Sequence, residues 1–197
     1  SILEELSRLG YQADWQLLLS SEFGVPQLRP RFILVAFRGQ LLERFRWPGA
    51  VSNPATVGRA LASLMSARGW PGTHTWARRA DGIAPTIVGG SKKHGGADLG
   101  PTRAKAAWAK LGVDGRGIAD NAPSAEDPVD LMPRLTNRMV ARLQGFDDQW
   151  RFSGRKTSVY RQIGNAFPPP VAKHIGLAIG RALGVGTVKS GFDVMAS

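Results

Sequence analysis

A run of six apolar residues at positions 32–37 constrains the fold of this chain more than any other feature. The run reads Phe-Ile-Leu-Val-Ala-Phe, and such an unbroken stretch is typical of a strand that is covered on both faces. Residues 11–19 alternate around Trp15, Leu17 and Leu19, which predicts a second strand. A turn-rich connection of roughly a dozen residues separates the two and indicates an antiparallel hairpin.

This hairpin needs more sheet than the sequence provides. A two-stranded ribbon is only marginally stable in water, and no other segment predicts a strand of comparable quality. Residues 2–9 predict the end of a helix, and the chain starts at Ser1 without an initiator methionine. We therefore expect a fragment or a processed chain, whose missing sheet residues precede Ser1.

The charge balance predicts a polyanionic partner. The 197 residues include 26 lysines and arginines and 15 acidic residues, which gives a net charge of +11. Such a surface attracts nucleic acid, because each neutralised phosphate releases counterions; a basic protein without such a partner is the alternative. Cysteine is absent, so the chain itself carries no thiol nucleophile. No run of about 18 apolar residues predicts a membrane span, and no leader predicts export.

Residues 45–133 are rich in glycine, proline and tryptophan and predict a small irregular module. We expect one amphipathic helix that ends at Gly69 and a short basic helix over 103–111. The apolar face of the first helix is formed by Val57, Leu61, Leu64 and Met65. Three tryptophans either pack this module or stack on bases, and packing is the simpler explanation: Trp70, Trp76 and Trp108. Three histidines are too widely spaced to predict a metal site: His74, His94 and His174.

Regular structure returns after residue 133. Thr136 predicts the N-cap of a helix that runs through Gln144 and stops at Gly145. A long helix is expected to follow Asn165, which we predict as its cap. Its apolar residues repeat every fourth position: Val171, Ile175, Ile179 and Leu183.

Two further segments carry residue types that bind ligands. Gln27, Arg29 and Arg31 lie among prolines just ahead of the apolar strand, and fixed guanidiniums bind phosphates or base carbonyls. Gly164 and Asn165 precede a proline-rich helix start, where free N–H groups suit a polar or anionic ligand. Each segment alone also fits a structural role, as a loop salt bridge or an ordinary capped helix.

Together, the order and spacing of these segments resemble the C-terminal half of the DNA (cytosine-5) methyltransferases. That family has a Gln-x-Arg-x-Arg motif, here 27–31, and a variable recognition region follows it. A Leu-Thr-x-Arg-…-Arg-Leu-Gln-Gly-Phe motif comes next, here 135–146, and then Gln-Ile-Gly-Asn-Ala-x-Pro-Pro, here 162–169. The family's cofactor loop, its Pro-Cys loop and its Glu-Asn-Val motif are missing and would precede Ser1. Met139 replaces the usual Glu, so we expect Thr136 to lack a reciprocal capping box.

The resemblance implies an α/β fold. It would be the C-terminal part of a Rossmann-like class I methyltransferase domain, an antiparallel hairpin plus helices, with an inserted, mostly irregular target-recognition domain. The implied division is 1–44 for a catalytic segment, 45–133 for target recognition, 134–184 for a second catalytic segment and 185–197 for a tail.

The resemblance also implies a site. A cytosine flipped out of double-stranded DNA would be attacked at C6 by a cysteine thiolate and methylated at C5 from S-adenosylmethionine. Arg31 would contact O2 of the base, Arg29 would orient Arg31 or touch the DNA backbone, and Gln27 would brace the loop. The cofactor pocket would be closed by Asn165, Ala166 and Phe167. The expected DNA contacts, some of which also fit a solvated basic loop, are Thr86, Ile87, Lys92, Lys93 and Arg103.

Two functions follow from this resemblance. In the first, the chain is part of a bacterial, cytoplasmic, nucleoid-associated methyltransferase, and the cysteine lies in a missing N-terminal part or in a separate subunit. The isolated chain would then be inactive. In the second, it is a stand-alone, non-catalytic DNA-binding or regulatory module. The upstream coding sequence discriminates between them. An RNA-binding protein is disfavoured because no stacking sheet is predicted.

Overall fold

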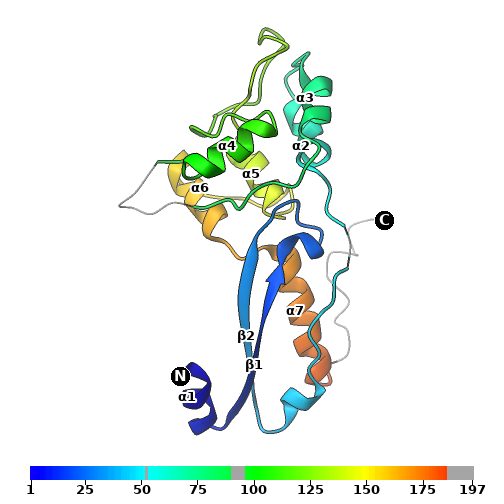
Figure 1. Ribbon diagram of the computed structural model, residues 1–197, viewed down its shortest axis with the longest axis vertical. Helices are drawn as coiled ribbons and strands as arrows, with labels where there is room; N and C mark the ends of the chain where they lie inside the picture. The colour runs from blue at the N-terminus through cyan, green and yellow to red at the C-terminus, as the bar shows by residue number, and fades with distance from the viewer. Residues whose placement is uncertain (52, 90–95, 186–197) are drawn as a thin grey trace.

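The computed structural model describes residues 1–51, 53–89 and 96–185 and shows an elongated molecule (Figure 1). One half holds the hairpin of β1 (Tyr11–Leu19) and β2 (Pro30–Arg38), with α7 (Pro169–Ala182) lying along it and α1 (Ile2–Arg8) at its far end. The other half is helical. It consists of α2 (Val57–Met65), α3 (Thr73–Arg79), α4 (Thr102–Lys110), α5 (Asn137–Leu143) and α6 (Lys156–Asn165). Two short 3-10 turns, η1 (Ser20–Glu22) and η2 (Leu41–Arg44), follow the strands.

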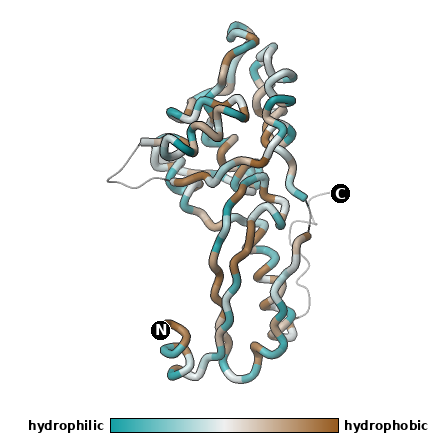
Figure 2. The backbone as a smooth tube through the Cα atoms, in the orientation of Figure 1, coloured by the Kyte–Doolittle hydropathy of each residue, from teal (hydrophilic) through white to brown (hydrophobic). Residues whose placement is uncertain are grey.

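The hairpin is apolar on both faces, but only one face is covered. The strands pair antiparallel from Tyr11 opposite Arg38 to Leu19 opposite Pro30, as predicted. One face packs against α7 and buries side chains from both elements: Leu18, Val35, Phe37, Val171 and Ile175. The opposite face, here called the outer face, exposes Trp15, Leu17, Leu19, Phe32 and Leu34. Figure 2 shows hydrophobic residues along the backbone of both strands.

The outer face is a substantial apolar surface. Phe32 is 72% exposed and Trp15 is 53% exposed, and their rings pack against each other with centroids 5.6 Å apart. Large contiguous exposed apolar patches mark surfaces that meet a protein, a membrane or a ligand. The sequence predicted a strand covered on both sides, and the described residues cover one.

Tryptophans organise the helical half, as expected from the sequence. Trp76 and Trp108 are buried together with Leu61. The Trp76 indole donates to the carbonyl of Gly112 at 3.0 Å, and that of Trp70 donates to Pro128 at 2.9 Å. The burial of these rings confirms packing rather than base stacking as their role.

Each helix predicted from the sequence is present, with two corrections. The apolar residues Val57, Leu61 and Met65 of α2 are buried, and α4 matches the predicted basic helix. The sequence missed α3 and α6. Asn165 does not cap the long helix, because it is the last residue of α6, and Pro168 precedes α7 with prolines in its first turn.

The start of α5 also corrects the sequence analysis. The Thr136 hydroxyl accepts from the Met139 amide at 3.3 Å, as expected for an N-cap. The Met139 sulfur lies 3.4 Å from the Thr136 amide and accepts from it. A thioether is a weak acceptor, so the reciprocal bond is present in weakened form rather than absent.

Within the part of the chain that the structure describes, no helix is long and apolar enough to cross a lipid bilayer.

Helices α2 and α3 cross at van der Waals contact through Gly58. A methyl group at Gly58 would lie 2.0 Å from the carbonyl oxygen of Ala77, so the crossing distance depends on the missing side chain. In α7, by contrast, a methyl group at Gly180 would meet no heavy atom within 4 Å.

We expect Gly58→Ala to lower the free energy of unfolding by about 1–3 kcal/mol, because the backbone of α3 must move away. Gly180→Ala is the matched control and should raise stability by roughly 0.5–1 kcal/mol, since it only improves helix propensity. Thermal unfolding followed by circular dichroism measures both. Equal shifts for the two variants would contradict the close crossing.

Candidate functional site

Three segments that are distant in the chain meet between the two halves of the molecule. Residue Gln27 forms a parallel bridge with Ala84. The Leu28 amide donates to Ala84 at 2.7 Å, and the Ala84 amide donates to Pro26 at 3.1 Å. The predicted Gln-x-Arg-x-Arg segment is therefore joined by backbone hydrogen bonds to Ala84, inside the predicted recognition region of residues 45–133.

A chain of buried amides extends this junction to α5 and α6. The Gln27 side chain accepts from the Ile87 amide at 2.8 Å and donates to the Gln144 side-chain oxygen at 2.6 Å. Gln144 in turn donates to the carbonyls of Ile163 at 3.1 Å and Ala166 at 2.9 Å. Both glutamines are fully buried, and a buried amide is stabilising only while its partners are present.

The guanidinium of Arg29 ties the same segments together. Arg29 is only 2% exposed and donates to the carbonyls of Ile87, Gly164 (2.8 Å) and Ala166 (3.3 Å). Its Nε lies buried without a hydrogen-bond acceptor among the described residues. Burial, with a smaller contribution from the nearby charge of Arg31, lowers the pKa of Arg29 to about 10, so it stays charged at neutral pH.

Arg31 lies two residues further along and is partly exposed. It is opposite Leu18 in the hairpin, which places it on the face that α7 covers. Its guanidinium donates to the Pro30 carbonyl at 2.7 Å, and burial lowers its pKa. The side chain therefore carries a partly desolvated positive charge that is available to a ligand, in contrast to Arg29.

The connection between α6 and α7 presents the predicted cofactor residues. Asn165 is exposed, and Phe167 is 36% exposed. The Ala166 carbonyl accepts from both Arg29 and Gln144. An exposed amide and an accessible aromatic ring two residues apart suit a ligand that has hydrogen-bonding groups and a flat heterocycle.

The predicted DNA contacts fall into three groups. The Thr86 hydroxyl donates to the Leu28 carbonyl, and the Ile87 side chain is fully buried in the helical core. That burial gives Ile87 a packing position, not an exposed one. Arg103 is exposed in the first turn of α4. Lys92 and Lys93 lie outside the described residues.

Two important residues of this junction were not singled out from the sequence. Gln144 entered only as part of the motif over 135–146 and as the end of a helix, and Tyr160 was given no role. The buried Tyr160 hydroxyl lies 3.0 Å from the Val88 carbonyl and also contacts the Asp98 carbonyl. Its burial raises its pKa, so it remains a neutral donor. One sequence feature could have pointed to Gln144: it is a polar residue directly before the glycine that ends the predicted helix.

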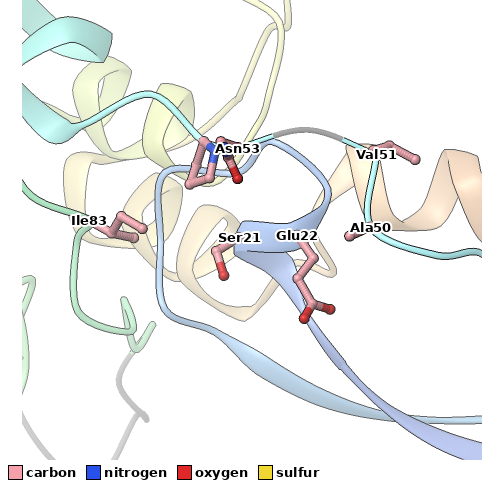
Figure 3. Close-up of a pocket in the computed structure, with 7 residues that line it drawn as sticks. Ser21, Glu22, Ala50, Val51, Asn53 and Ile83 are labelled. Carbon is pink, nitrogen blue, oxygen red and sulfur yellow. The ribbon is translucent and has the colours of Figure 1, made fainter.

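An open hollow of about 500 Å³ lies elsewhere, between η1 and the extended segment that leads to α2. Figure 3 shows it lined by Ser21, Glu22, Ala50, Val51, Asn53 and Ile83. The amide of Val51 donates to the carbonyl of Glu22 at 2.9 Å, which holds the two walls together. None of the site residues predicted from the sequence lines this hollow.

Comparison with known proteins gives the family. A family model described as C-5 cytosine-specific DNA methylase matches residues 1–181. The chain belongs to this family. It is 59% identical over 183 residues to the Type II methyltransferase M.NaeI of Lentzea aerocolonigenes and 44% identical over 186 residues to the Type II methyltransferase M.NgoMIV of Neisseria gonorrhoeae.

The matches cover most of this chain but only part of each relative. They include 92% of this chain, 44% of M.NaeI and 58% of M.NgoMIV, so the chain spans about half the length of these curated relatives. Two solved structures share its fold. They are the Entamoeba histolytica methyltransferase EhMeth (TM-score 0.58, 13% identity, 92% of this chain and 57% of that one) and the S. pombe methyltransferase Dnmt2 (TM-score 0.52, 16% identity, 91% and 61%). The predicted fold, a methyltransferase part with an antiparallel hairpin and helices, is confirmed.

We expect Gln27→Met to lower the free energy of unfolding by about 1–3 kcal/mol. The change keeps the side-chain length but leaves the Ile87 amide and the Gln144 oxygen buried without partners. The exposed Gln149→Met is the matched control and should change stability by less than about 0.5 kcal/mol. Urea unfolding of the chain measures both. Equal stability of the two variants would show that the buried amides contribute nothing.

Proposed function

We propose that this chain is the C-terminal part of a DNA (cytosine-5) methyltransferase. The complete enzyme would transfer a methyl group from S-adenosylmethionine to C5 of a cytosine flipped out of double-stranded DNA. The observation that carries the proposal is the buried junction in which Gln27 and Arg29 hold the recognition region to the connection between α6 and α7. Its relatives are named Type II methyltransferases, which supports a role in a restriction–modification system.

The residues of the junction fit distinct roles in that reaction. We assign Arg31 to O2 of the cytosine, because its charge is partly exposed. We assign Arg29 to the orientation of Arg31 rather than to the DNA backbone, because Arg29 is buried. Gln27 braces both. Residues 165–167 form one wall of the cofactor site, and S-adenosylmethionine supplies the methyl group when it is bound there.

We place DNA contacts on the recognition part, taken as residues 45–133. Arg103 is exposed and suited to a phosphate, and Lys92 and Lys93 remain proposed phosphate contacts. Thr86 stays a proposed groove residue, although its hydroxyl is engaged with Leu28. For Ile87 we propose a packing role only.

The attacking thiolate must come from outside this chain, because the sequence contains no cysteine. The relatives have further sequence outside the matched part, and the outer face of the hairpin is exposed. We propose that an N-terminal portion, on the same polypeptide or on a separate subunit, covers the outer face and supplies the cysteine. The stand-alone module is not favoured, because identity to Type II methyltransferases extends over 92% of the chain.

The direct test is completion of the enzyme. The chain is joined behind the segment of M.NaeI that precedes the matched region, and this hybrid is called the completed enzyme below. We expect it to methylate DNA at a defined sequence, as read by bisulfite sequencing, whereas the isolated chain transfers no methyl group. Methylation by the isolated chain would refute the proposal, and so would an inactive but folded completed enzyme.

In the completed enzyme we expect Arg31→Ala to reduce turnover of bound DNA by about 100-fold or more, which is typical for removal of a charged group that stabilises a transition state. Salt-sensitive DNA binding should change little, because one cation among many is lost. Single-turnover kinetics with saturating enzyme separate the two effects. If binding falls while turnover of bound DNA persists, the role assigned to Arg31 is wrong.

A further inference from the structure

Residues 84–89 form a strap that links the recognition part to the proposed cofactor wall. Its first half is held by the Gln27 and Arg29 contacts already described. At its other end, the Val88 carbonyl accepts from the Tyr160 hydroxyl at 3.0 Å. Gly89 then ends the strap against the last turn of α6, and both Gly89 and Gly164 are buried there.

The approach between these two glycines leaves no room for a side chain. A methyl group built on Gly164 would lie 2.5 Å from the Cα atom of Gly89. A methyl group built on Gly89 would lie 2.7 Å from both Cγ and Oδ1 of Asn165 and 2.9 Å from its backbone nitrogen. The strap therefore lies directly against the side chain of Asn165, and real contacts at such distances require one partner to move.

We propose that Gly89 is a positioning residue for the cofactor site: the strap of the recognition region sets the place of the Asn165 side chain. This inference rests on the proposed function, because it takes Asn165 as a cofactor contact. Asn165 is exposed on the side that Gly89 does not occupy, so its amide is fixed from behind by backbone of the recognition part. An amide that is displaced by about 1 Å loses its alignment with a bound ligand.

A structural role alone predicts a different outcome from positioning. If the glycine pair only packs two elements, Gly89→Ala lowers stability and leaves the affinity of the folded protein for cofactor unchanged. If Gly89 positions Asn165, the loss of affinity depends on the Asn165 amide and disappears when that amide is removed. A double-mutant cycle separates the two.

The test is the dissociation constant of S-adenosylhomocysteine, measured by isothermal titration calorimetry on the completed enzyme without DNA. We expect Gly89→Ala to weaken binding about tenfold, the value of one well-made hydrogen bond. Gly96→Ala is the matched control and should stay within about twofold, because a methyl group there meets no heavy atom within 4 Å. In an Asn165→Ala background, Gly89→Ala should cost less than about twofold.

Each outcome decides the proposal. Equal affinities for Gly89→Ala and Gly96→Ala overturn it, and so does a tenfold loss that persists in the Asn165→Ala background. If Gly89→Ala does not fold, Tyr160→Phe is used instead, because it removes one hydroxyl that holds the strap and adds no atoms. That hydroxyl contacts the carbonyls of Val88 and Asp98, so its removal should weaken binding about threefold, and unchanged affinity again overturns the proposal. A folded completed enzyme that binds no S-adenosylhomocysteine refutes the proposed function as well, whereas normal binding with insensitive variants refutes this inference alone.

Discussion

The buried guanidinium of Arg29 is the interaction on which the described structure depends. It carries a positive charge in a site where every partner described is a backbone carbonyl, and these carbonyls belong to Ile87 and to Gly164 and Ala166 at the end of α6. A buried charge is costly unless its donors are satisfied, so the surrounding backbone is held in one arrangement. The amides of Gln27 and Gln144 add neutral hydrogen bonds around the same carbonyls, and the Gln-x-Arg-x-Arg segment becomes the joint between two halves of the molecule.

The hairpin, in contrast, is held in place by hydrophobic contacts rather than by polar ones. Its inner face is satisfied by α7, while its outer face exposes a row of large apolar side chains that includes Phe32. The two faces differ in their packing. One face packs against α7, and the other is left uncovered by the described residues. The chain spans about half the length of these relatives, and its sheet has one uncovered face; both observations support the N-terminal portion proposed above.

Local sequence rules predicted the elements whose apolar residues are strongly periodic. The two strands, α2 and the core of α7 follow directly from such spacing. Helix α3 was missed because it buries little besides Trp76, and α6 was missed because only three of its residues are buried. Asn165 was misread as a cap, since its helix had not been predicted and α7 begins at Pro169, four residues later.

The sequence named candidate site residues, which remain proposals, but it did not give their arrangement. The motif resemblance pointed to Gln27, Arg29 and Asn165, yet nothing local distinguishes the buried Arg29 from the partly exposed Arg31. That difference is set by Ile87 and Gly164, which lie more than fifty residues away in the chain. The roles of Gln144 and Gly89 are likewise tertiary, because each is defined only by the segment it touches.

The strap of residues 84–89 has a consequence for engineering new sequence specificity. Because residues 84–89 lie within the proposed recognition part of 45–133, a graft of that whole part from another methyltransferase brings its own strap, which then meets a foreign Arg29 and a foreign α6. A graft that instead retains residues 84–89 with the recipient keeps every contact of the junction native. Chimeric enzymes built on this scaffold should therefore exchange loops on either side of the strap and leave the strap itself in place.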